Sequence, residues 1–186
     1  AKVLAGGMPG GAVAGRKDIL GWLDFEMSAA AKHERISHQG THNGHAVCAA
    51  AGIATLKIIR DTDACARATA MAAALKKGMN EVLEEEGVPW AMYGDYSFFH
   101  FFTNPENRTI KPTTFDAHAV PADWFKTDKR ETLLRKVVLG LMINGVDPKS
   151  WRGGLVSAAH TPEDIQFTIE AWRKTLRAMR DEGAFS

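Results

Sequence analysis

Apolar residues recur at helical spacing in four segments of this chain, and the pattern predicts four amphipathic helices. The segments span residues 44–61, 62–86, 128–144 and 161–179. The apolar stripe of the first is Val47, Ala51, Ala54 and Ile58, and that of the last is Ile165, Ile169, Trp172, Leu176 and Met179. We therefore expect each helix to bury one face and leave the other in water.

Capping residues predict where these helices begin and end. Thr62 is the expected N-cap of the second helix, and Gly87 and Gly145 are the expected stops of the second and third. Thr161 is the expected N-cap of the last helix, because Pro162 suits the first turn and two acidic residues follow it.

Shorter apolar and aromatic runs predict strands. Residues 12–19 begin with small apolar side chains, residues 90–93 and 96–103 are rich in aromatic side chains, and residues 153–158 form a short apolar run. Residues 24–39 and 104–123 are polar and irregular, and we expect loops there. Strands alternate with helices in the C-terminal half, so the predicted fold class is α/β.

Composition narrows the class of protein. The chain has 186 residues, which suggests one domain or a large and a small unit, and a net charge of +1, which predicts no nucleic-acid partner. No apolar run approaches the ~20 residues of a membrane span. Cys48 and Cys65 are too few for a disulfide framework, so we expect a cytoplasmic protein.

Two places near the N-terminus suggest chemistry. Lys2 precedes a stretch, Ala5–Gly15, in which five residues are glycine. A neutral lysine amine can form a Schiff base with an aldehyde cofactor, and glycines would let the cofactor approach; a solvated lysine beside structural glycines is the alternative. Gly40 and Thr41 stand before a predicted helix, where a hydroxyl and exposed amides suit a phosphate; an ordinary capped helix start is the alternative.

Two further groups of side chains are candidates for binding. His33, His38, His42 and His45 lie in one short loop and could bind a transition metal, but Glu34 is the one acidic residue near them, so we predict no metal site. Arg152 precedes two glycines and could present its guanidinium to a carboxylate, or it could be a surface arginine.

Four motifs, in order, together resemble class III, fold-type-I pyridoxal-phosphate aminotransferases, and among them the proteins similar to glutamate-1-semialdehyde 2,1-aminomutase. A lysine leads into a glycine-rich segment, a Gly-Thr pair precedes a helix, an aromatic strand follows, and a Ser-x-Ala-His-Thr-x-Glu-Asp-Ile ending closes the series. The matching stretches are residues 2–12, 38–44, 96–103 and 154–165. The resemblance covers nearly the whole chain but only the C-terminal half of such an enzyme.

The resemblance implies the fold, the cofactor and the site. Residues 1–60 would be the end of the cofactor-binding large domain, and residues 61–186 the connecting helix and the small α/β domain. Lys2 would hold pyridoxal 5'-phosphate as an internal aldimine and move the proton at the substrate carbon. Gly40 and Thr41 would bind the cofactor phosphate across a homodimer interface. The substrate would be a small amino acid, keto acid or amino aldehyde.

The sequence also departs from the family's pattern. The half that supplies the aspartate beneath the pyridine nitrogen, the stacked aromatic residue and the first phosphate loop has no counterpart here, so we expect a fragment or a chain completed by another. Arg152 stands where the aminomutase pattern has a glutamate, which favours a substrate carboxylate as its partner. Ala46 stands where the family has a proline after the Gly-Thr pair.

Three functions remain open from the sequence. The first is amino-group transfer, as an aminotransferase or an aminomutase, through Lys2. The second is a truncated, non-catalytic chain that serves as a folding or dimer module. The third, less favoured, is a metal-binding protein that uses the histidine loop.

Overall fold

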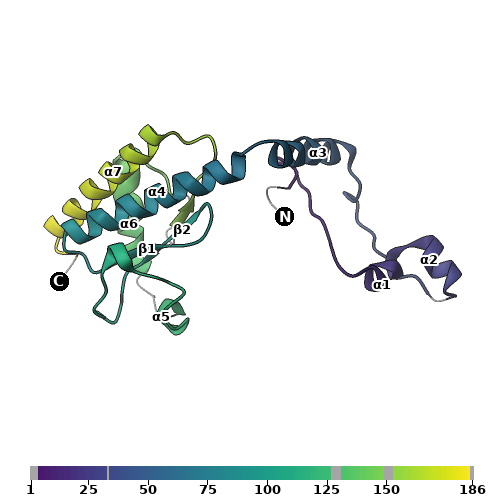
Figure 1. Cartoon of the computed structure of the whole chain (residues 1–186), viewed down its shortest axis with the longest axis horizontal. Coiled ribbons are helices and arrows are strands. Elements are labelled where there is room, and N and C mark those ends of the chain that lie inside the picture. Colours follow the sequence, from purple (N-terminus) through teal and green to yellow (C-terminus); the bar gives the residue numbers. More distant parts are fainter. Residues whose placement is uncertain (1–3, 33, 127–130, 149–152, 185–186) are drawn as a thin grey trace. The chain divides into compact units, whose positions relative to one another are not determined.

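The structure is a computed structural model that describes residues 4–32, 34–126, 131–148 and 153–184. The chain divides into two compact units, Ala1–Thr62 and Asp63–Ser186, and each is considered by itself (Figure 1). None of the helices described is long and apolar enough to cross a membrane.

The regular structure of the first unit is helical. It consists of α1 (Lys17–Leu20), a 3-10 turn at Gly21–Leu23, α2 (Phe25–Ala30) and α3 (Ala46–Asp61). α3 confirms the first predicted helix, but the predicted buried stripe is wrong, since Val47 and Ile58 are 57% and 56% exposed. The buried residue of α3 is Gly52.

The predicted strand at residues 12–19 is wrong. Residues 10–16 form neither helix nor strand, and α1 begins at Lys17. A strand needs a partner for its backbone groups, and none of the described residues of the first unit pairs with this segment. Arg16 instead donates two hydrogen bonds to the Asp18 carboxylate, at 3.0 and 2.6 Å, and an acidic residue in the first turn favours a helix start.

The predicted loop at residues 24–39 contains a helix. Asp24 is the N-cap of α2, and its Oδ1 accepts a hydrogen bond from the Met27 N–H at 2.9 Å. Aspartate is a preferred N-cap residue, so Asp24 was a sequence signal for the start of this helix.

Thr62 plays a different part from the one predicted. It follows the last residue of α3, and its hydroxyl donates to the Ile58 carbonyl at 2.7 Å. Asp63 occupies the N-cap position of α4 (Ala64–Glu85). Threonine can bond back to the carbonyl four residues earlier as readily as it can cap the next helix, and composition does not distinguish the two.

The second unit contains a three-stranded antiparallel sheet of order β1-β2-β3. The strands are β1 (Ala91–Tyr93), β2 (Phe98–Phe102) and β3 (Gly153–Leu155), which confirm the three predicted in this part of the chain. Tyr93 pairs with His100 across β1 and β2, and His100 pairs with Gly153 across β2 and β3.

Three long helices bury one face of this sheet. They are α4, α6 (Glu131–Ile143) and α7 (Pro162–Asp181); α7 packs against both α4 and α6, and α4 also contacts β1 and β2 (Figure 1). The centre of the core is Trp172, which is fully buried with its ring centroid 5.5 Å from that of Phe101 and 6.4 Å from that of Trp90. The predicted stripe of α7 is confirmed, with Ile169 partly buried and its other members buried.

A second aromatic cluster lies at Phe102, a residue that is absent from the helix-facing core. Phe102 stacks on Phe115 at 5.3 Å and meets Phe125 edge-on at 5.4 Å. Phe115 follows a 3-10 turn at Pro112–Thr114, and Phe125 belongs to α5 (Asp123–Lys126). The long segment between β2 and α6 is therefore anchored to the sheet by aromatic rings.

The predicted helix ends of the second unit are confirmed. Thr161 and Asp164 form a reciprocal capping box at the start of α7, where Pro162 occupies the first turn. Gly87 and Gly145 follow α4 and α6 with φ of +64° and +85°, a conformation that glycine adopts without strain.

Asn80 connects α4 to β1 through a buried side-chain amide. Its Oδ1 accepts from the Met92 N–H at 2.7 Å, and its Nδ2 donates to the Met92 carbonyl at 3.0 Å. One side chain thus satisfies both backbone polar groups of Met92 in a part of the core that is closed to water.

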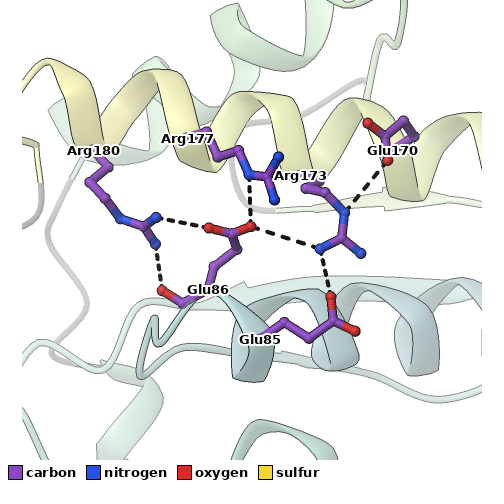
Figure 2. A network of polar contacts seen from close by, with 6 residues as sticks. All are labelled: Glu85, Glu86, Glu170, Arg173, Arg177 and Arg180. Atoms are coloured by element: carbon purple, nitrogen blue, oxygen red, sulfur yellow. Dashed lines mark hydrogen bonds and ion pairs between the residues drawn. The ribbon is translucent and has the colours of Figure 1, made fainter.

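Glu86 is the centre of a charge network between the end of α4 and α7 (Figure 2). The Glu86 side chain is only 7% exposed, and it accepts hydrogen bonds from Arg177 and Arg180, each at 2.8 Å. Arg173 adds an ion pair to Glu85 at 2.5 Å. The hydrogen bond from Arg180, aided by that from Arg177, outweighs the opposing effect of burial and holds the pKa of Glu86 below its usual value.

We expect Asn80→Ala to lower the free energy of unfolding by about 1–3 kcal/mol, because both backbone groups of Met92 would lose their partner while buried. Urea titration followed by circular dichroism measures the change. Lys77→Ala, at an exposed position of the same helix, is the control and should change stability little. Equal effects of the two substitutions would contradict this role of Asn80.

We expect Glu86→Gln to destabilise the fold at pH 7 by about 1–3 kcal/mol. The folded pKa of Glu86 is lowered, so its stabilisation is present above the unfolded value of about 4.3 and is lost as the pH falls through the folded pKa. The stabilities of wild type and variant should therefore converge in acid. Glu163→Gln, on the exposed first turn of α7, is the control. A difference that does not change with pH would refute the assignment.

Candidate functional site

The predicted site residues lie partly outside the residues that the structure describes. Lys2 and Arg152 are both outside them, while Gly40 and Thr41 lie in the first unit. The structure does show the segments that follow Lys2 and Arg152, and these explain the glycines beside them.

The segment that follows Lys2 packs closely on α3. Ala5 is buried, and its Cα lies 3.8 Å from where a side chain at Gly52 of α3 would begin. A Cβ on Gly6 would come within 2.6 Å of Thr55 Oγ1, and Gly6 has φ of +58°. Gly6 and Gly52 therefore let the backbone after Lys2 pack against α3. This contact supports the interpretation of Gly6 as structural.

Thr55 is a residue of this contact that the sequence analysis missed. Its hydroxyl donates to the Ala51 carbonyl at 2.9 Å, within α3, and its side chain faces Gly6. The sequence around Thr55 carries no local signal for this contact, because Gly6 lies far from it in the chain.

Gly40 and Thr41 form an exposed turn just before α3. The Asn43 N–H donates to the Gly40 carbonyl at 2.9 Å, and the Asn43 amide fills the space that a side chain on Gly40 would need, with Oδ1 2.8 Å from that position. Gly44 has φ of +70°. His45 is the N-cap of α3, and its Nδ1 accepts from the Cys48 N–H at 3.4 Å.

The histidine loop shows no metal-binding geometry among the described residues, which leave out His33. No group of three or more histidine, cysteine or acidic side chains in that part of the chain could hold an ion. The rings of His42 and His45 are 6.3 Å apart, and His45 is occupied as a helix cap.

The two glycines after Arg152 are required by the sheet. A Cβ on Gly153, at φ of +149°, would come within 2.8 Å of the His100 Cα, and one on Gly154 would come within 2.6 Å of the Phe99 ring. Arg152 is therefore joined directly to a strand that has no room for side chains at these two positions.

His160 organises the turn between β3 and α7. Its Nδ1 accepts a hydrogen bond from the Ser157 N–H at 3.0 Å and lies 3.1 Å from the Ser157 hydroxyl. The next residue, Thr161, begins the capping box.

Known proteins resemble the chain over nearly its whole length, although no family model matches it. It is 30% identical over 180 residues to a glutamate-1-semialdehyde 2,1-aminomutase of Thermus thermophilus, a match that covers 94% of this chain and 37% of that protein. The aminomutase of Thermomicrobium roseum is 30% identical over 175 residues, with the same two coverages. The chain thus spans little more than a third of these relatives' length.

Solved structures show the same relationship. A transaminase with pyridoxal phosphate bound matches 99% of this chain and 38% of its own, at a TM-score of 0.76 and 26% identity. An omega-transaminase from Sphaerobacter thermophilus matches 96% of this chain and 37% of its own, at a TM-score of 0.75 and 23% identity. The predicted resemblance and fold class are confirmed: the chain has the fold of the C-terminal part of a fold-type-I transferase.

We expect Gly6→Ala to loosen the segment that follows Lys2, because the new methyl group would meet Thr55 Oγ1 and the backbone would be strained at φ of +58°. Gly7→Ala is a matched control, since Gly7 has φ of +92° but nothing within 4 Å of its Cβ position. Amide hydrogen exchange at residues 4–10 and 48–56 should rise more in Gly6→Ala. Equal exchange in both variants would mean that backbone strain alone matters.

Proposed function

We propose that this chain is the C-terminal part of a pyridoxal-phosphate enzyme that moves an amino group between two substrates or within one. The observation that carries the proposal is the ordered set of four motifs, from Lys2 to Ile165, on a chain whose relatives are an aminomutase and transaminases. The substrate would be a small amino acid, keto acid or amino aldehyde.

Lys2 is the residue that we propose for covalent attachment of the cofactor. Its amine would bond to the cofactor aldehyde and later move a proton at the substrate carbon. Pyridoxal phosphate, when bound, supplies an electron sink for that carbon. The close packing of Ala5 and Gly6 on α3 supports this role, because a nucleophile works best beside a segment that is held in place.

Gly40 and Thr41 are proposed to bind the cofactor phosphate. Both residues are exposed, and the turn that contains them leads directly into the N-terminus of α3. A hydroxyl and backbone amides at such a place fit a phosphate, and a side chain at Gly40 would collide with Asn43. The site residues present here therefore suit the group they would hold.

Arg152 is proposed to bind a substrate carboxylate. A guanidinium offers two parallel donors to a carboxylate, and the glycine pair behind it is fixed in β3 by its contacts with β2. An arginine here, where the aminomutase pattern has a glutamate, favours an acidic substrate or amino-group acceptor.

A homodimer with an active site shared across its interface is the proposed assembly. Several large apolar side chains of α3 are about half exposed: Val47, Ile53, Leu56, Ile58 and Ile59. A group of this size on one helix is unusual for a free surface and is typical of one that another protein surface covers. These side chains lie in the unit that carries Gly40 and Thr41.

We expect Lys2→Ala to abolish covalent attachment of pyridoxal phosphate. The protein that contains this chain is incubated with the cofactor and reduced with borohydride, and the modified peptide is identified by mass spectrometry. Label on the peptide that contains Lys2, retained in the control Lys17→Ala and lost in Lys2→Ala, is the expected result. A folded protein that carries no label on this peptide would favour the non-catalytic alternative.

A further inference from the structure

The second unit contains a cavity that the proposed function does not use. It has a volume of about 720 Å³ and opens at the turn between β1 and β2. Its apolar lining is largely aromatic: Tyr93, Phe98, His100, Phe115 and Phe125. All of these residues belong to the second unit, and none is a predicted cofactor or substrate residue.

The aromatic wall presents flat surfaces for stacking. The rings of Phe98 and His100 are nearly parallel, with planes 13° apart and centroids separated by 6.4 Å. The Tyr93 ring lies 5.4 Å from His100 and 4.7 Å from Phe125. Phe98 is 50% exposed although it is on a central strand, so its ring is open to a ligand.

Lys76 of α4 brings a positive charge to this cavity. Its ammonium donates to the Gly94 carbonyl at 2.5 Å and to the Phe98 carbonyl at 3.1 Å. An ammonium has three donors, so one remains for an acceptor in the cavity. Burial lowers the pKa of Lys76, and the nearby carboxylate of Asp95 partly opposes that effect.

Two carboxylates also line the cavity: Asp95, on the turn between β1 and β2, and Asp116, on the segment after β2. Asp95 pairs with His118 at 3.1 Å, and the hydrogen bond that its carboxylate accepts from the His118 ring raises the pKa of His118. Asp116 is exposed, and one of its oxygens accepts from the His118 N–H at 2.9 Å. The lining thus carries the ammonium of Lys76 together with the carboxylates of Asp95 and Asp116, so groups of both signs face the same cavity.

We propose that this cavity binds an aromatic amino acid as its zwitterion. The ring would stack on Phe98 and His100, the carboxylate would accept from Lys76, and the ammonium group would face Asp116. A volume of about 720 Å³ lies within the 300–1,000 Å³ of ordinary small-molecule sites, so such a ligand fits with room to spare. A purely anionic ligand would be repelled by Asp116, and an aliphatic one would not use the stacked rings.

Isothermal titration of the protein that contains this chain with L-tryptophan, in the absence of pyridoxal phosphate, tests this proposal. We expect saturable binding that Phe98→Ala weakens by about tenfold, from the loss of a stacking partner. Asp116→Asn, at an exposed position, should weaken it as well. Phe167→Ala, which removes a comparably exposed ring on α7 outside the cavity, should not.

Three ligand analogues separate the recognised groups. L-leucine lacks the ring, tryptamine lacks the carboxylate and indole-3-propionate lacks the ammonium group, so each should bind more weakly than L-tryptophan. Lys2→Ala should leave binding unchanged, which keeps this result distinct from the outcome for the proposed function. Absence of saturable binding, or binding that both Phe98→Ala and Asp116→Asn leave unchanged in folded protein, would overturn the proposal.

Discussion

The second unit depends on covering a sheet that is too small to stand alone. Its three strands contain three, five and three residues, and such a sheet is stable only when one face is packed against other elements. Trp172 of α7 meets this constraint, because its buried ring contacts Phe101 of β2 and Trp90 just before β1. The capping box at Thr161 and the arginines that hold Glu86 then set where α7 begins and how it lies on α4.

Sequence patterns predicted the second unit better than the first for a physical reason. The stripe of α7, its cap at Thr161 and the stops at Gly87 and Gly145 are local signals that agree with the tertiary packing. In the first unit, most apolar residues of α3 are exposed, so periodicity could not identify its packed side. The small apolar residues that begin the segment 12–19 likewise resemble the start of a strand, but a strand also requires a neighbour that the sequence does not reveal.

The sequence predicted the motifs of the candidate site, but it did not predict which residues contact one another there. The turn at Gly40 and Thr41 lies before a helix as expected, while the contact between Gly6 and Thr55 joins residues far apart in the chain and left no local pattern. The aromatic cavity is similar: the ring-rich strand was evident, but Lys76, Asp95 and His118 come from three other segments. The assignment of residues 1–60 and 61–186 to a large and a small domain stays a prediction.

Asn80 has a consequence that reaches beyond the stability of one helix contact. β1 is the outer strand of its sheet, and outer strands expose backbone groups that can recruit a strand from another molecule. By taking both the N–H and the carbonyl of Met92, Asn80 occupies the pairing groups at the middle of that strand. The same amide that anchors α4 thus also protects this edge against aggregation.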